Sequence, residues 1–192
     1  SPHNPTGGVL EKEDLHGIAD LAKKHDIIIL SDEVYEHIIY EGKHHSIASI
    51  NNMLDRTILL GGFSKTFAMT GWRLGYAALP AALVEAIVNL IITSVSCTAT
   101  FIQHAGIEAL NGPRNSLPKM VNEFRRRRNL IIEGLNEIPG ISCVRPKGAF
   151  YAFPNVKKFG MNSKHLADYL LNEAGVATLA GSDFGNYGEG YL

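Results

Sequence analysis

The chain has 192 residues, of which 45% are hydrophobic and 19% are charged, and its formal net charge is −1. This composition predicts a soluble globular protein with a sizeable core, and the balanced charge gives no indication of nucleic acid or an acidic membrane as a partner. No apolar stretch is long and uninterrupted enough to span a membrane, and the only two cysteines, Cys97 and Cys143, lack metal-ligand or redox spacing, which favours a reducing compartment such as the cytoplasm.

The chain opens on a turn, in which Asn4, Pro5, Thr6 and Gly7 follow one another directly. Proline fixes φ and glycine permits a positive φ, so the tetrapeptide presents the amide of Asn4 from a rigid loop. Many surface turns have this composition, and the tetrapeptide alone is a weak functional signal.

A helix and a buried strand are expected next. Residues 11–25 place leucine, isoleucine and alanine along one stripe, with Lys23 and Lys24 at the end where the helix dipole favours cations. The apolar run 27–30 predicts a parallel strand that is buried on both faces.

Asp32 and Tyr35 follow the carboxyl end of this strand, where open α/β sheets bind ligands. A carboxylate at the end of a buried strand requires a partner, and a protonated pyridine nitrogen would be one. A capping or loop aspartate and a core tyrosine with a satisfied hydroxyl are the structural alternatives. Taken alone, each alternative is favoured over a functional role.

Several polar residues beside this motif receive no chemical role, namely Glu33, Glu36 and His37. The pair His44 and His45 offers possible metal ligands, but no neighbouring cluster of Cys, Asp or Glu completes a coordination set. We therefore expect a solvated loop here and no metal site.

Residues 57–60 form a second apolar run that predicts another buried strand, and Gly61 and Gly62 then allow a sharp turn. Ser64 and Lys65 should therefore lie just past the end of this strand.

Lys65 is a candidate nucleophile because its neighbours in sequence are apolar, and desolvation disfavours the charged form of an amine. Arg73 offers a planar fork of donors that suits a phosphate, and the hydroxyl of Ser64 can add a hydrogen bond. The combination indicates an amine that forms a Schiff base beside an anion site. The structural alternative is a buried lysine paired with a carboxylate. The apolar neighbours are Phe63, Phe67, Met69 and Trp72.

The middle of the chain predicts a short strand over residues 74–79 and helices over residues 81–95, 98–110 and 115–137. The third helix carries four consecutive arginines, 125–128, and its own glutamates can pair with some of them. We expect a solvated helix that links two domains rather than a nucleic-acid surface.

The last part of the chain predicts paired strands over residues 141–144 and 148–153 and a helix from Ser163, its expected cap, to about Glu173. A final short strand is expected over residues 176–179.

Residues 64–76, Ser-Lys-Thr-Phe-Ala-Met-Thr-Gly-Trp-Arg-Leu-Gly-Tyr, resemble the lysine segment of the class I/II pyridoxal-phosphate-dependent aminotransferases, the aspartate aminotransferase-like branch of fold type I. The turn at Asn4 and the pair of Asp32 and Tyr35 match further motifs of that family in the expected order. The segment 146–151 resembles part of its small C-terminal domain. The resemblance covers essentially the whole chain.

This resemblance implies an α/β fold. Residues 1–114 would be part of the fold type I large domain, a mostly parallel sheet with covering helices, and residues 115–192 would be a linking helix and a small α+β C-terminal domain. It also implies the cofactor pyridoxal 5'-phosphate, held as a Schiff base by the catalytic residue Lys65. The other cofactor contacts that it implies are those of Asn4, Asp32, Tyr35, Ser64 and Arg73.

The implied activity is the transfer of an amino group from an aspartate-like or aromatic amino acid to a 2-oxo acid, in a ping-pong cycle with Lys65 moving a proton. Asn4 would also lie near the substrate carboxylate. A homodimer is implied, with no nucleic acid, membrane or metal as a partner.

Two neighbouring features of the family would lie outside the chain, a strand before Asn4 and a substrate-binding arginine after Leu192. We therefore interpret the chain as a C-terminal half fragment that is inactive by itself. Such a fragment would expose an unpaired strand edge and an apolar face.

Two alternatives remain open. A pyridoxal-phosphate-dependent carbon–sulfur β-lyase can keep the same cofactor-binding residues, since the bond held perpendicular to the ring decides the reaction. A non-catalytic aminotransferase-like domain of a transcription regulator would bind the cofactor as a sensor. Pyruvate release from an amino acid would identify the first, and an attached helix-turn-helix segment the second.

Overall fold

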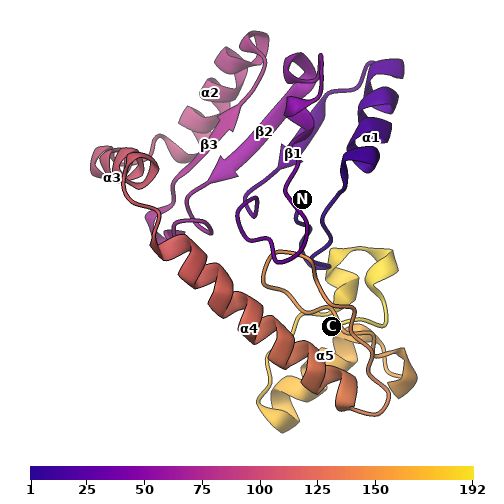
Figure 1. Cartoon of the computed structure of the whole chain (residues 1–192). Coiled ribbons are helices and arrows are strands. Elements are labelled where there is room, and N and C mark those ends of the chain that lie inside the picture. Colours follow the sequence, from indigo (N-terminus) through magenta and orange to yellow (C-terminus); the bar gives the residue numbers. More distant parts are fainter.

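A computed structural model describes all 192 residues as a mixed α/β structure with two parts (Figure 1). The first part contains the sheet with the helices beside it, and the second contains the C-terminal helix with irregular segments around it. The elements of the first part are α1 (Lys12–Lys24), β1 (Ile29–Asp32), β2 (Thr57–Gly62), β3 (Gly75–Ala78), α2 (Ala81–Val95) and α3 (Thr100–Asn111). Those of the second part are α4 (Ser116–Glu137), which runs into it from the sheet, and α5 (Ser163–Ala174).

Short 3-10 helices occupy several connections: Ile47–Ser49, Leu54–Arg56, Thr70–Trp72, Lys157–Phe159, Gly181–Phe184 and Asn186–Gly188. None of the α-helices combines the length and the apolar content that a membrane span requires.

The sheet has the strand order β1-β2-β3. β1 and β2 run parallel, with Asp32 opposite Leu60, whereas β2 and β3 are antiparallel, with Gly61 opposite Tyr76. The loop between β2 and β3 is closed by the backbone N–H of Phe63, which donates to the carbonyl of Leu74 at 3.2 Å. Parallel neighbours end at the same edge, so the loop after β2 begins beside the end of β1.

The helix expected over residues 11–25 is confirmed as α1. Its first turn is capped by the carboxylate of Asp14, which accepts from the backbone N–H of Glu11 at 3.0 Å. Its apolar stripe packs on one face of the sheet, in a core cluster of Leu15, Ala19, Ala22, Ile47 and Met53.

A second core cluster joins the two parts of the chain. It consists of Tyr35, Ile38, Tyr40, Val121 and Ala149, which come from the loop after β1, from α4 and from the segment before residue 150. This cluster places the C-terminal part against the end of β1.

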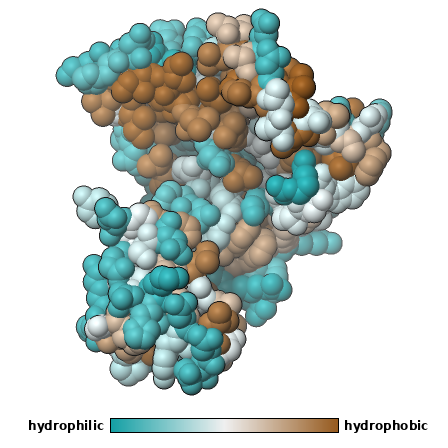
Figure 2. Space-filling view, turned by 180° about the vertical axis from the view of Figure 1, so that it is seen from behind, coloured by the Kyte–Doolittle hydropathy of each residue, from teal (hydrophilic) through white to brown (hydrophobic).

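The expectation of a strand over residues 27–30 that is buried on both faces is wrong. β1 begins only at Ile29, and Ile27 and Ile28, which precede it, are 52% and 54% exposed. Within β1, Leu30 is 65% exposed because α1 packs on the other face of the sheet. Exposed hydrophobic side chains form the broad brown region in the upper part of Figure 2. On α5, Leu166 is buried, whereas Tyr169 and Leu171 are 52% and 53% exposed.

The strands expected over residues 141–144, 148–153 and 176–179 do not form. Only isolated bridges occur there, such as the one between Ser142 and Asn155. Ala149 has a positive φ of 57°, which is not an extended conformation. The backbone N–H of Gly148 donates to the carbonyl of Gly7. The segment therefore cannot form the regular hydrogen bonds between neighbouring strands that a hairpin needs.

The expected cap of α5 is also corrected. The side chain of Asn162 accepts from the backbone N–H of His165 at 2.8 Å and is therefore the N-cap. The hydroxyl of Ser163 instead accepts from the backbone N–H of Gly190 at 2.8 Å.

Candidate active site

Lys65 is half-buried on the loop that follows β2. Its amine lies 5.6 Å from the ring centre of Tyr35 and 5.2 Å from that of Phe150. It forms no ion pair and no side-chain hydrogen bond within the chain. The lysine therefore lies among aromatic rings with its amine unpaired, and the alternative of a lysine paired with a carboxylate is not what the structure shows.

The rings around this amine are not those expected from the sequence. Phe63 and Phe67 stack on each other with centroids 5.2 Å apart. Phe67, Met69 and Trp72 line a hollow against α3 instead. The reason is local, because the backbone N–H groups of Phe67 and Met69 both donate to the carbonyl of Phe63 and curl the loop away from the amine.

Tyr35 is buried, with 6% of its surface exposed, and its hydroxyl contacts that of Tyr151 in a short hydrogen bond. Its ring packs edge-on against Phe150 and Tyr151, with centroids 5.3 and 5.6 Å away. Burial, reinforced by the hydrogen bond between the hydroxyls of Tyr35 and Tyr151, raises the pKa of Tyr35 well above its usual range. The phenol therefore remains protonated at neutral pH.

Phe150 and Tyr151 also belong to the candidate site, although the sequence analysis did not single out either residue. They belong to the segment 146–151, which was noted for its resemblance and predicted to be a strand. The positive φ of Ala149 and the bond from its backbone N–H to the carbonyl of Ile38, 2.9 Å long, bring both rings to Tyr35. A Lys-Gly-Ala sequence before two aromatic residues was the available signal, since glycine indicates a turn.

Asp32 lies at the end of β1, next to Tyr35, and is exposed rather than buried. One of its carboxylate oxygens accepts from the backbone N–H of Val34 at 3.1 Å, the geometry of a loop aspartate, while the other accepts no hydrogen bond. The expectation of a buried carboxylate is corrected, because this face of the sheet is open. The free oxygen remains available to a ligand.

The turn at Asn4 is tied to both parts of the chain. The N-terminal ammonium of Ser1 donates to the carbonyl of Asp32 at 3.1 Å. The backbone N–H groups of Lys147 and Gly148 donate to the carbonyl of Gly7 at 3.0 Å. Asn4 lines a hollow of about 660 Å³ that Tyr151 also lines. Asn4 is thus connected to Tyr35 and Lys65 through Tyr151, whose ring packs on that of Tyr35.

Ser64 and Arg73 lie on the closed loop between β2 and β3. Arg73 is exposed, with a left-handed backbone (φ 54°), and one of its guanidinium nitrogens donates to the carbonyl of Thr70 at 2.8 Å. Ser64 is half-buried and has no side-chain hydrogen bond. The remaining guanidinium donors and this hydroxyl are free to bind an anion.

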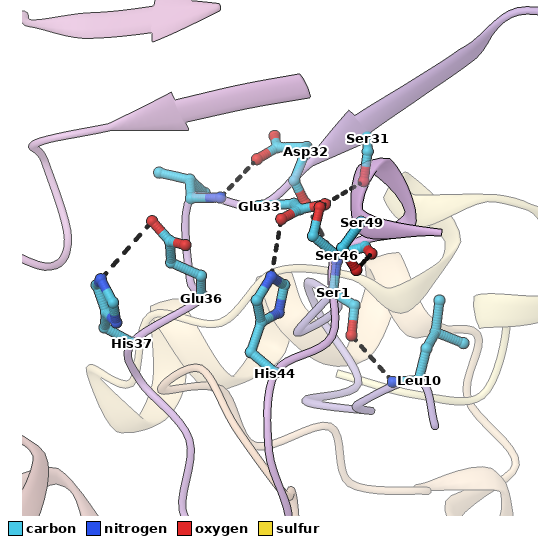
Figure 3. A network of polar contacts seen from close by, with 11 residues as sticks. Ser1, Leu10, Ser31, Asp32, Glu33, Glu36, His37, His44, Ser46 and Ser49 are labelled. Carbon is cyan, nitrogen blue, oxygen red and sulfur yellow. Dashed lines mark hydrogen bonds and ion pairs between the residues drawn. The ribbon is translucent and has the colours of Figure 1, made fainter. Parts of the chain in front are cut away.

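A buried polar network supports the turn that carries these groups (Figure 3). Glu33 is 3% exposed, and its carboxylate accepts from the hydroxyls of Ser31 and Ser46 at 2.9 and 2.8 Å and contacts the imidazole of His44 at 2.8 Å. Burial acts to raise the pKa of Glu33, but the hydrogen bonds from His44, Ser46 and Ser31 together outweigh it and hold the pKa below its usual range. The carboxylate is therefore ionised at neutral pH.

His44 is consequently not the solvated loop residue that was expected, since only 14% of its side chain is exposed. Ligand atoms of Glu33, Glu36 and His44 lie within 4.8 Å of one another, a cluster that the sequence spacing did not reveal. Both oxygens of Glu33 are engaged by neighbouring side chains, which gives the cluster a structural role. The backbone N–H of Glu33 donates to the carbonyl of Leu60 at 2.9 Å, so the network fixes the end of β1 to β2.

Comparison with known proteins gives a consistent result. The family model described as aminotransferase class I and II matches residues 1–192. The chain is 51% identical, over its whole length, to an aspartate aminotransferase of Pyrococcus abyssi and 50% identical to an aromatic-amino-acid aminotransferase of Thermococcus litoralis. The structure of an aromatic aminotransferase from Pyrococcus horikoshii matches the whole chain with a TM-score of 0.95 and 50% identity.

These relatives are longer than the chain. It covers 50% of each of the two relatives in sequence and 52% of the P. horikoshii structure. The chain thus spans about half the length of the proteins that it matches.

Proposed function

The chain belongs to the class I and II aminotransferases, which are fold type I enzymes dependent on pyridoxal phosphate, and from this we propose that its site serves the transfer of an amino group from an amino acid to a 2-oxo acid. The observation that carries the proposal is the unpaired amine of Lys65 over the rings of Tyr35 and Phe150. An amine without a carboxylate partner among aromatic rings is suited to covalent bonding with an aldehyde.

The residues present fit pyridoxal 5'-phosphate. The free oxygen of Asp32 can accept from a protonated ring nitrogen, and the phenol of Tyr35 can donate to a ring oxygen when Tyr151 is the donor in the bond between the two hydroxyls. The free donors of Arg73 and Ser64 suit the phosphate, and the amide of Asn4 can donate to the same ring oxygen as Tyr35. When bound, the cofactor supplies an electron sink for a carbanion at the substrate α-carbon.

Within this site Lys65 has two roles. Its amine would hold the cofactor, and once displaced by the substrate amine it would serve as the general base that takes the proton from the substrate α-carbon. The negative charge of Asp32 would favour a protonated ring nitrogen. The donor would leave its amino group with the bound cofactor and depart as a 2-oxo acid before the acceptor 2-oxo acid takes that group up, which gives a ping-pong order.

Aspartate-like or aromatic amino acids are the proposed donors, since the relatives quoted above act on aspartate and on aromatic amino acids by name. The same names favour an aminotransferase over a β-lyase or a regulator domain. We propose a homodimer in the cytoplasm. We also propose a domain boundary between residues 114 and 115, just before α4 begins at Ser116.

The cofactor assignment is tested by equilibrium dialysis of the chain against pyridoxal 5'-phosphate. We expect Lys65→Ala to weaken binding by tenfold or more. Pyridoxine 5'-phosphate, which has no aldehyde, is the matched ligand control and should bind the parent chain and the variant alike. Equal affinity of the two proteins for pyridoxal 5'-phosphate would remove Lys65 from the proposal.

A further inference from the structure

The hydroxyl of Tyr151 has a single hydrogen-bond partner in the chain. That partner is the hydroxyl of Tyr35, on the loop after β1, whereas Tyr151 belongs to the C-terminal part. A phenol has one proton to donate and can also accept, so one member of such a pair donates and the other accepts. The direction of this bond decides whether the proton of Tyr35 is available to a third group.

The backbone beside Tyr151 holds its hydroxyl against Tyr35. The backbone N–H of Ala149 donates to the carbonyl of Ile38 at 2.9 Å, and the hydroxyl of Tyr40 donates to the carbonyl of Ala149. Both Ala149 and Ile38 are fully buried. The rings of Tyr35 and Tyr151 pack edge-on with centroids 5.6 Å apart. Buried groups on both sides therefore fix the hydroxyl pair in place.

No other side chain competes for the two hydroxyls. The carboxylate of Asp32 accepts from the backbone N–H of Val34 at 3.1 Å. The amine of Lys65 lies over the ring of Tyr35, 5.6 Å from its centre. Neither Asp32 nor Lys65 forms a hydrogen bond with either hydroxyl. Tyr151 is therefore the group of the chain that can direct the proton of Tyr35.

The direction of the bond depends on what else Tyr35 contacts. After burial, the bond with Tyr151 is the next cause that raises the pKa of Tyr35, and a bond has this effect on a phenol that donates. A ligand oxygen that takes the proton of Tyr35 leaves the oxygen of Tyr35 as an acceptor only. The hydroxyl of Tyr151 then has to donate for the pair to remain bonded.

On the basis of the proposed function, we propose that Tyr151 is a positioning residue of the cofactor site. Its hydroxyl accepts from Tyr35 in the chain alone, and it donates to Tyr35 once a ring oxygen of the cofactor takes the proton of Tyr35. No covalent bond forms or breaks, because each hydroxyl keeps its proton and only rotates about its C–O bond. Consecutive hydrogen bonds strengthen one another, so Tyr151 makes Tyr35 a stronger donor and stabilises a negative charge on the ring oxygen.

The proposal is tested with pyridoxine 5'-phosphate, which has the ring hydroxyl but no aldehyde, so the result does not depend on a Schiff base at Lys65. The acid dissociation constant of the bound ring hydroxyl is measured by an absorbance titration of the ligand on the full chain. We expect Tyr151→Phe to lower this constant about twofold and Tyr35→Phe to lower it about tenfold. Tyr169→Phe, at a side chain 52% exposed on α5, is the matched control and should leave it unchanged.

The double variant separates positioning from a structural role. If Tyr151 acts through Tyr35, then Tyr151→Phe should have no further effect in a chain that already carries Tyr35→Phe. A merely structural role would give the same loss in both backgrounds.

NMR of chains carrying ¹³C at the tyrosine Cζ observes the change of donor directly. Pyridoxine 5'-phosphate should shift the signal of Tyr151. The ligand 3-deoxypyridoxine 5'-phosphate, which lacks the ring oxygen, should bind without this shift. In the Tyr35→Phe variant neither ligand should shift the signal.

Two outcomes would overturn this inference alone. One is a bound ring hydroxyl that responds to Tyr35→Phe but not to Tyr151→Phe. The other is an effect of Tyr151→Phe that persists in the Tyr35→Phe background. A parent chain that binds neither ligand would instead contradict the proposed function, and the role of Tyr151 with it.

Discussion

The hydroxyl of Tyr35, on the loop after β1, meets the hydroxyl of Tyr151, which lies 116 residues further along the chain. This contact joins the sheet part to the C-terminal part at the point where the amine of Lys65 lies over the ring of Tyr35. The geometry of the candidate site therefore depends on both parts.

Replacing Tyr151 by Phe should change Tyr35 in a measurable way. Burial is the largest cause of the raised pKa of Tyr35, and the hydrogen bond between its hydroxyl and that of Tyr151 is the next. Loss of that bond should therefore lower the pKa, while burial still holds it above about 10. The shift is measured by NMR of chains carrying ¹³C at the tyrosine Cζ. Tyr187→Phe, at a fully exposed tyrosine, is the control and should leave the Tyr35 signal unchanged.

Arg128 should be the one arginine of residues 125–128 that matters for stability. Its side chain is 6% exposed, and it donates to Glu41 at 2.8 Å and to the carbonyl of Pro146 at 3.0 Å. Arg128→Ala should lower the free energy of unfolding by about 2 kcal/mol, because it leaves the buried carbonyl of Pro146 without a donor and removes the guanidinium from the ring of Tyr40. Arg127→Ala, which removes a solvent-exposed pair with Glu123, should cost much less, because water screens that pair. Urea titrations of both variants compare their free energies of unfolding. Equal losses would contradict the view that Arg128 alone among these arginines stabilises the fold.

Gly7 should tolerate no side chain. Its φ is +66°, and a Cβ there would lie 2.8 Å from the carbonyl oxygen of Gly148 and would overlap Pro146. Gly7→Ala should therefore destabilise the chain by about 2 kcal/mol or more through strain and overlap. Gly134→Ala, in the middle of α4 with nothing near the added atom, should stabilise by about 0.5–1 kcal/mol. Thermal unfolding of the two variants should shift in opposite directions.

The network around Glu33 should make stability depend on pH in the acid range. The pKa of Glu33 is lower in the folded chain than the value of about 4.3 expected after unfolding. The free energy of unfolding that the ionised carboxylate of Glu33 adds is therefore fully present above about pH 4.3. This added stability is lost as the pH falls through the pKa of Glu33 in the folded chain. Glu33→Gln should flatten this part of the curve of unfolding free energy against pH. Glu173→Gln, at an exposed glutamate, should leave the curve as in the parent chain.

Local patterns predicted the helices well. α2 coincides with the expected residues 81–95, and α1, α3, α4 and α5 begin and end within two residues of their expected limits. Amphipathic spacing and turn residues carry this information, and they lie within each segment. The order Asn4, Asp32, Tyr35 and Lys65 likewise predicted a common region. The structure places the amine of Lys65 over the ring of Tyr35, while the cofactor-binding roles of these residues stay a prediction.

The failures concern contacts between distant segments. Phe150 reaches Lys65, and Tyr151 reaches Tyr35, only because Ala149 adopts a positive φ, which no periodicity reveals. Glu33 and His44 are 11 positions apart and meet only because the loop between them folds back. Their spacing in the sequence does not indicate this contact. Leu30 is exposed because no segment covers its face of the sheet. Which segment covers a face depends on the whole fold and not on the residues around Leu30.

The central claim, that Lys65 is the amine that binds pyridoxal phosphate, is tested most directly by covalent trapping. The chain is mixed with pyridoxal 5'-phosphate and reduced with borohydride, and the modified peptides are located by mass spectrometry, with Lys65→Ala as the control. We predict an adduct confined to Lys65 and absent from the variant. Labelling spread evenly over exposed lysines, or a pattern that Lys65→Ala leaves unchanged, would contradict the assignment.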